Sequence, residues 1–252
     1  MTGDLTHISL PSEFRRAAEQ LRDLGEPDKV FLIPGNHDCY VDVPASEGWD
    51  HWAEYLRGDT EAYADAEIAE HLSPSPSPGV APRYADFPTV RMHGRLATIG
   101  LCSAIPTPMF RAGGMLGPAQ LERLEGLLEL LRSRGLCRVL MIHHPVAMKG
   151  EPERRALWDG EALRAILART GAELVIHGHK HRRLVNYVDG PVGPIPVVGV
   201  PSSSEVGSEP SKRAQYHVYT VRPDGEGYAV SAEARAYCAD NESFGSVDGA
   251  VL

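Results

Sequence analysis

Three histidine-bearing segments lie far apart in the sequence, and each closely follows a short apolar run. They are Gly35-Asn-His-Asp38, His143-His-Pro145 and His177-Gly-His-Lys-His181. A single histidine behind a strand is more often a hydrogen-bonded structural residue than a metal ligand. Three such segments, together with the Gly3-Asp4 pair near the start, make coincidence a poor explanation. The pattern therefore indicates a metal site.

The apolar runs before these segments predict buried strands at residues 29–33, 138–142 and 173–176. Pro34-Gly35 should end the first strand abruptly, so that the next three residues lie on a loop. Because the carboxyl ends of parallel strands meet at one edge of a sheet, we expect the three loops to converge there.

The available side chains are imidazole nitrogens with carboxylate and amide oxygens, and the segments contain no thiolate ligand. Such a set suits Mn, Fe, Zn or Co and indicates catalysis more than a cysteine-rich structural zinc site. The four cysteines lack CxxC spacing and indicate reduced thiols, not a disulfide framework; they are Cys39, Cys102, Cys137 and Cys238.

Helices alternate with strands in the first part of the chain, and strands follow one another in the rest. We expect an α/β fold with sheets packed against each other, formed by one domain over residues 1–252. A variable cap or insert is expected at about 40–84 and a short tail at about 238–252. Helices are expected at 12–24, 119–131 and 161–170, a helical stretch at 49–72, and further strands at 89–92, 96–102, 195–200, 216–221 and 228–237.

The composition restricts the class of protein. The 252 residues are 42% hydrophobic and 23% charged, which is typical of globular proteins, and no apolar run predicts a membrane span. The formal net charge of −9 disfavours binding to long nucleic acids. The start of the chain does not look like an export signal, so a cytoplasmic location is expected.

Taken in order, four motifs resemble those of calcineurin-like metallophosphoesterases: Gly3-Asp4, Gly35-Asn36-His37-Asp38, His143 and Gly178-His179-Lys180-His181. Their arrangement looks closest to that of small bacterial cyclic-nucleotide phosphodiesterase-like members. The resemblance implies a four-layer α-β-β-α sandwich. The family's first motif, Asp-x-His, occurs nowhere in this chain, so the first β-strand of that sandwich is expected to be lacking.

The resemblance also implies a centre of two divalent metal ions. Asp4 would bridge both ions, and His181 would bind the first. Asn36, His143 and His179 would complete the shell of the second. Without Asp-x-His, the first ion keeps only two of its ligands.

Two further residues receive roles from the resemblance, and two stay open. His37 would protonate or stabilise the leaving-group oxygen, with Asp38 orienting its ring. His144 could support a ligand from behind, face the substrate or bond to the backbone. His7 could join the site, although support of the site or a helix cap is the simpler role. His177 is expected to be structural.

The functional hypothesis is hydrolysis of a small, cyclic nucleotide-like phosphodiester by in-line attack of a metal-bound hydroxide. A phosphomonoesterase, a nucleotide-sugar pyrophosphatase or a lipid-phosphate hydrolase would need the same centre. The missing motif allows two explanations: its strand lies upstream of Met1, or the chain is a weakly active enzyme or a non-catalytic scaffold. Selectivity is expected from residues 40–84 and 110–116, where Gly113-Gly114 would permit a mobile loop. The natural substrate and the oligomeric state stay open.

Overall fold

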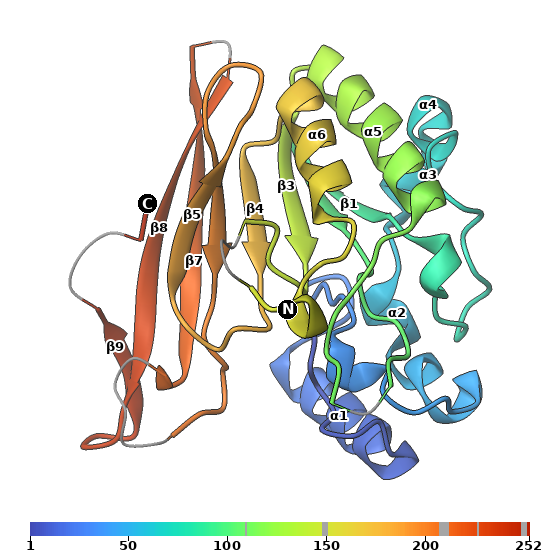
Figure 1. Ribbon diagram of the computed structural model, residues 1–252, viewed down its shortest axis with the longest axis vertical. Helices are drawn as coiled ribbons and strands as arrows, with labels where there is room; N and C mark the ends of the chain where they lie inside the picture. Colours follow the sequence, from blue (N-terminus) through green and yellow to red (C-terminus); the bar gives the residue numbers. More distant parts are fainter. Residues whose placement is uncertain (109, 148–150, 207–211, 226, 248–250) are drawn as a thin grey trace.

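The computed structural model describes residues 1–108, 110–147, 151–206, 212–225, 227–247 and 251–252. Their strands form a six-stranded sheet with the order β1-β2-β3-β4-β6-β5 and a three-stranded sheet with the order β7-β8-β9 (Figure 1). The strands are β1 (Thr89–His93), β2 (Leu96–Gly100), β3 (Cys137–Ile142), β4 (Leu174–His177), β5 (Leu184–Val188), β6 (Ile195–Gly199), β7 (Gln215–Asp224), β8 (Gly227–Cys238) and β9 (Ser243–Ser246).

The helices lie mainly in the first two thirds of the chain. The α-helices are α1 (Pro11–Leu24), α2 (Ala53–Leu56), α3 (Thr60–Ala64), α4 (Ala66–Ala69), α5 (Pro118–Ser133) and α6 (Gly160–Thr170). Short 3-10 helices occur at η1 (Asn36–Asp38), η2 (Ala45–Glu47), η3 (Trp49–Trp52), η4 (Tyr84–Asp86) and η5 (Glu153–Arg155). The predicted helices at 12–24, 119–131 and 161–170 are confirmed as α1, α5 and α6.

The centre of the larger sheet is parallel, while the edge strands β1 and β5 are antiparallel to their neighbours. In this register Ile142 of β3 pairs with His177 of β4. The two strands therefore end side by side, and the segments that follow them leave the sheet at the same edge. This confirms the expected convergence for the loops that carry His143 and His179.

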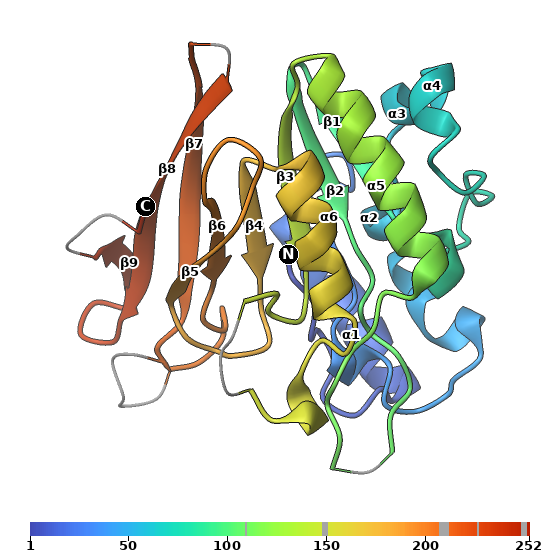
Figure 2. The same ribbon diagram turned by 45° about the horizontal axis from the view of Figure 1, so that its top comes forward.

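Alternate side chains of the central strands enter two different cores, because successive residues of a strand point to opposite faces of the sheet. Leu140 and Ile142 pack with the apolar residues of α5 and α6. Cys137 and Val139 pack against the second sheet. The two views show α5 and α6 on one side of the larger sheet and β7 and β8 on the other (Figures 1 and 2).

The second sheet closes the fold opposite the helices. Ala232 of β8 and Val251 are buried against the larger sheet, and β9 pairs with β8, so the predicted tail at 238–252 contributes to the packing. The opposite face exposes Val218 and Phe244, and none of the described helices covers it. The described layers are helix, sheet and sheet. The expected α/β class is confirmed, but the described helices do not form the fourth layer of the expected α-β-β-α sandwich. No described helix has both the length and the apolar character needed to cross a membrane.

Residues 40–84 form a packed insert. The helical stretch expected at 49–72 is divided into η3, α2, α3 and α4. Trp52 and Leu56 are fully buried and pack against Phe14 and Leu21 of α1. The described part of this insert therefore stabilises the base of the domain around α1.

The predicted strand at 29–33 is not part of the sheet. Its last residues are extended, but their hydrogen bonds go to two different segments: the Leu32 amide donates to the Tyr55 carbonyl (2.9 Å) and the Ile33 amide to the Met1 carbonyl (3.2 Å). These bonds form no ladder with a neighbouring strand. The segment still delivers Gly35 and η1 to the sheet edge.

Candidate metal centre

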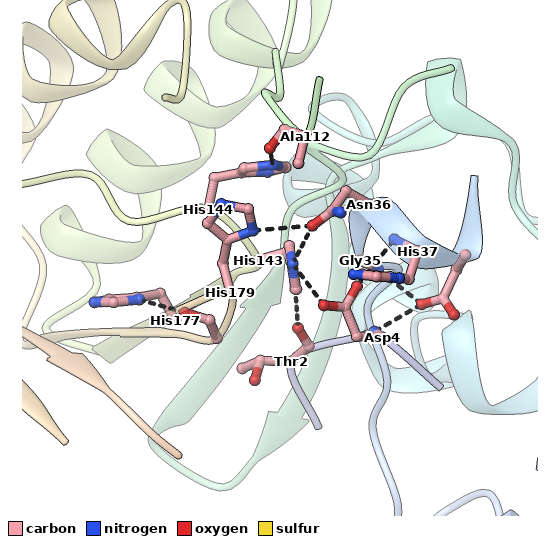
Figure 3. A network of polar contacts seen from close by, with 12 residues as sticks. Thr2, Asp4, Gly35, Asn36, His37, Ala112, His143, His144, His177 and His179 are labelled. Carbon is pink, nitrogen blue, oxygen red and sulfur yellow. Dashed lines mark hydrogen bonds and ion pairs between the residues drawn. The ribbon is translucent and has the colours of Figure 1, made fainter. Parts of the chain in front are cut away.

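Most of the predicted site residues surround one cavity of about 330 Å³ at the edge where β3 and β4 end (Figure 3). His143 and Asp38 are buried in direct contact with the lining residues. His144 and His7 do not line the cavity. The lining residues are Asp4, Asn36, His37, Tyr40, Ala112, Arg155, His179, Lys180 and His181.

Gly35 lets the loop before η1 lie directly against the Asp4 loop. A Cβ atom on Gly35 would lie 2.2 Å from Oδ1 of Asp4 and 2.8 Å from Cε1 of His143. Side chains are not accommodated at such distances. The glycine of the Gly-Asn-His-Asp segment is therefore required for close approach, and it brings three segments distant in sequence into contact.

Asp38 organises the backbone of the Asp4 loop. One carboxylate oxygen accepts the amides of Asp4 (2.8 Å) and Gly35 (2.9 Å), and the other accepts the amide of Thr6 (2.9 Å). Burial and the nearby Asp4 carboxylate raise the pKa of Asp38 to about 6. The prediction that Asp38 orients the ring of His37 is wrong, because its carboxylate faces these backbone amides.

The ring of His37 is held by His7 instead. His37 Nδ1 lies 2.7 Å from the His7 carbonyl, and the two rings are stacked with centroids 5.7 Å apart. The part of the chain that the structure describes gives Nε2 of His37 no hydrogen-bond partner. His37 therefore lines the cavity with one nitrogen available for a ligand.

His143 and His179 converge on one atom, Oδ1 of Asn36. His143 Nε2 and His179 Nδ1 each lie 2.9 Å from it, and Asp4 Oδ2 lies 3.3 Å from His143 Nε2 (Figure 3). The other ring nitrogen of His143 lies 2.6 Å from the Thr2 carbonyl, to which it donates. In a neutral ring this leaves the lone pair of Nε2 facing two oxygen acceptors, an arrangement that a bound cation would stabilise.

The pKa values of the two histidines, His143 and His179, are shifted in opposite directions. Burial opposes charge on Asp4 and His143, but their mutual attraction outweighs it, lowering the pKa of Asp4 to about 2 and raising the pKa of His143. Burial, followed by the nearby His143, lowers the pKa of His179 to about 2. His179 is therefore neutral, which is the form of imidazole that binds a metal ion.

Three predicted ligands have left-handed backbone: Asp4 (φ 60°), His179 (φ 64°) and His181 (φ 50°). Non-glycine residues rarely adopt this conformation, which costs on the order of 1 kcal/mol or more each. Three other non-glycine residues of the described ranges share it. The strain is thus concentrated at the predicted ligands, as expected where the surrounding structure fixes a functional geometry.

A metal ion at this centre would depend on Asn36. Within the described ranges, no three His, Cys, Asp or Glu side chains are placed to hold a metal ion by themselves. With the Asn36 amide oxygen, Asp4, His143 and His179 complete a set whose contacts of 2.9 to 3.3 Å fit one cation. Ligands about 2.0–2.2 Å from a shared ion lie roughly 3 Å from each other.

The first ion of the expected pair has fewer predicted ligands in this chain. Its predicted ligands in this chain are Asp4 and His181, which line the same cavity. Catalytic metal sites of the zinc type usually have about three protein ligands. The donor chemistry therefore fits one ion at the Asn36 side, with nitrogen and oxygen ligands that suit Zn, Mn, Fe or Co.

His144 acts as a structural support. Its Nδ1 lies 2.8 Å from the Ser103 hydroxyl and its Nε2 lies 3.1 Å from the Ala112 carbonyl. Burial lowers its pKa well below the ordinary value, so the ring is neutral with both nitrogens bonded. Its ring lies 4.6 Å from that of His179. Of the roles left open, these contacts correspond to a ring that bonds to the backbone and packs behind the predicted ligand His179. His177 is also fully buried.

Gly113 and Gly114 provide close packing in place of the expected mobile loop. A Cβ atom on Gly113 would lie 2.6 Å from the Trp158 indole, and one on Gly114 would lie 2.3 Å from the His144 ring. The Trp158 amide also donates to the Gly114 carbonyl (2.8 Å). The segment is therefore held against its neighbour.

Three lining residues were not predicted. Tyr40 accepts a hydrogen bond from the Asn36 amide group, which keeps the amide oxygen turned toward the histidines. It is the one lining residue from region 40–84 among those described. Lys180 stands between two predicted ligands, so the motif itself signals its position. Arg155 carries no comparable signal in the sequence.

The fold and the centre define the class of protein. The family model of calcineurin-like phosphoesterases matches residues 1–183, and the chain belongs to that family. It is therefore a metal-dependent phosphoesterase in class. A search of curated proteins found no match.

Solved structures resemble the chain at low sequence identity. A dimetal phosphatase from Danio rerio is 13% identical with a TM-score of 0.50, covering 89% of this chain and 75% of the other. The protein GAP50, described as the anchor in the inner membrane complex of Plasmodium, is 12% identical with a TM-score of 0.40, covering 98% and 85%. The first similarity supports the fold.

Proposed function

We propose that the chain hydrolyses a small phosphodiester with a divalent metal ion held by Asp4, Asn36, His143 and His179. The observation that carries this proposal is the convergence of two histidine nitrogens on the Asn36 amide oxygen beside the cavity. A cavity of about 330 Å³ suits a small ligand. The net charge of −9 argues against a long nucleic acid.

The chain's own contacts prepare these ligands. When bound, a divalent cation would neutralise charge on the phosphoryl oxygens and lower the pKa of the attacking water. The Thr2 carbonyl accepts from Nδ1 of His143 and so keeps Nε2 turned toward the site. The Asp38 carboxylate holds the amide of Asp4, which fixes the direction of the Asp4 side chain.

His37 is the proposed proton donor to the leaving group. Its Nδ1 is bonded to the His7 carbonyl, which leaves Nε2 for the substrate. When protonated, Nε2 would hydrogen-bond to the ester oxygen and transfer its proton as the P–O bond breaks. The stacked ring of His7 restricts rotation of His37.

Hydrolysis assays separate the candidate substrate classes. With Mn²⁺, bis-p-nitrophenyl phosphate should be hydrolysed faster than p-nitrophenyl phosphate. The reverse preference would favour a phosphomonoesterase. Failure to hydrolyse either ester with Mn, Zn, Fe or Co would refute the enzymatic proposal and favour a scaffold. Metal analysis of the same samples distinguishes one bound ion from two.

The role of His37 has its own test. His37→Ala should lower kcat by about 100-fold, because general acid catalysis contributes roughly 10²–10⁴-fold, and should leave the metal content unchanged. The loss should be greater for an alkyl leaving group than for p-nitrophenolate, which departs without a proton. His93→Ala, at the exposed end of β1, is the matched control. Equal losses for both leaving groups would contradict the proton-donor role.

A further inference from the structure

Arg155 has a free cationic head at the cavity. Its side chain is exposed and lines the cavity together with Asp4, His37 and His179. Within the described part of the chain, the guanidinium has neither a hydrogen-bond partner nor a salt-bridge partner. A free arginine beside predicted metal ligands is suited to bind an anion.

Lys180, the other cationic side chain that lines the cavity, is already paired with a carboxylate. Lys180 Nζ lies 2.7 Å from Oε2 of Glu151, with side chains 18% and 7% exposed. A pair this well shielded keeps its charges directed at each other. Among the described lining residues, Arg155 is therefore the cation whose charge is available to a ligand.

The backbone on both sides of Arg155 is firmly held. The Ala112 amide donates to the Arg154 carbonyl (2.7 Å) and the Gly114 amide to the Ala156 carbonyl (3.0 Å). The Trp158 indole donates to the Glu153 carbonyl (2.9 Å). A guanidinium on a fixed backbone loses less freedom when it binds a ligand, which favours binding.

The same contacts connect Arg155 to the proposed metal ligands. Ala112 bonds on both sides: its amide donates to the Arg154 carbonyl, and its own carbonyl contacts Nε2 of His144. The His144 ring packs on His179. One continuous set of contacts therefore sets the position of the Arg155 segment relative to His179.

We propose that Arg155 binds the phosphoryl oxygens of the substrate, so that the site recognises the anionic phosphoryl group itself. This inference rests on the proposed function. The planar guanidinium donates two parallel hydrogen bonds to a phosphate, a geometry that a lysine does not reproduce. The hydrolysed anion should bind in the same way, and inorganic phosphate is therefore a suitable probe.

The test measures phosphate binding by isothermal titration calorimetry on the full chain with Mn²⁺. Arg155→Ala should raise the Kd for inorganic phosphate on the order of 10- to 100-fold, as expected for loss of charge-assisted hydrogen bonds. The Kd of Arg155→Lys for inorganic phosphate should lie between those of the wild type and Arg155→Ala. Arg154→Ala is the matched control: it removes the same charge at the neighbouring position, where the side chain does not line the cavity. It should change the Kd less than about twofold.

Three outcomes would overturn the inference. They are wild-type affinity in Arg155→Ala, equal weakening in Arg154→Ala and Arg155→Ala, and no phosphate binding by the wild-type chain with Mn²⁺. Failure of the proposed function is distinguishable: a chain that hydrolyses no phosphoester but binds phosphate through Arg155 would refute catalysis and retain the binding role. Bound Mn²⁺ should be equal in all three variants and the wild type.

Discussion

The contact between the two loops at Gly35 can be tested with a single methyl group. In Gly35→Ala the added Cβ would lie 2.2 Å from Oδ1 of Asp4, 2.5 Å from its amide nitrogen and 2.8 Å from Cε1 of His143. Because Cβ atoms stay about 3.0 Å or more from other heavy atoms, Asp4 must retreat by roughly 0.8 Å. The backbone of Gly35 is extended (φ −105°), so alanine adds no backbone strain and the effect is steric.

This displacement should cost about 1–3 kcal/mol of stability, the usual range for overpacking. It should weaken Mn²⁺ binding more strongly, since Asp4 is a proposed ligand, and a shift of about 1 Å can lower turnover about 100-fold. Calorimetric titration with Mn²⁺ and thermal unfolding provide the two readouts. Gly193→Ala, where no atom lies within 4 Å of the new Cβ, is the matched control. A Gly35→Ala variant with wild-type Mn²⁺ affinity would refute the proposed positioning of Asp4.

Three further predictions concern other parts of the chain. Asn36→Leu, similar in size but without the amide oxygen, should lower bound Mn²⁺ at unchanged secondary structure, as measured by metal analysis and circular dichroism. Glu173→Ala should lower the free energy of unfolding by about 3 kcal/mol, because it leaves the buried guanidinium of Arg138 without its carboxylate partner at 2.8 Å; chemical denaturation measures this. Burial lowers the pKa of His217 from 6.5 to about 4, so the unfolded chain binds a proton that the folded chain does not between these pH values. Stability should fall as the pH is lowered through this window, and less steeply in His217→Phe.

The strands and helices that the sequence predicted correctly have a strong local signal. Within the strand predicted at 138–142, residues 139–142 are continuously apolar because both faces of the strand are covered, and α5 has leucines at helical spacing. β5 was missed because Leu184-Val-Asn-Tyr-Val188 alternates in burial but not in polarity: its exposed positions are Val185 and Tyr187. Residues 29–33 are as apolar as a central strand but bond to two different segments. Local apolar character does not reveal which partners a segment will find.

The candidate site was predictable to a similar extent. The histidines that follow β3 and β4 could be expected to converge, since these parallel strands end at the same edge of the sheet. The distant partners of Asp38 could not be inferred, because two of the amides that it binds, those of Asp4 and Thr6, lie more than 30 residues away in the chain. Arg155 was missed for the same reason: its position depends on bonds between the segments around Ala112 and Arg154.

The strained backbone at the centre accounts for the number of supports around it. Asp4 and His179 have left-handed conformations that an isolated segment would avoid. The Asp4 conformation is held by the Asp38 carboxylate, and His179 is held between Asn36 and the buried ring of His144. The groups that hold Asp4 and His179 are neutral or hydrogen-bonded, and they leave the nitrogen and oxygen atoms of the proposed ligands facing one another. These contacts therefore bring the nitrogen and oxygen donors together during folding, and the proposed cation would meet ligands that are already in position.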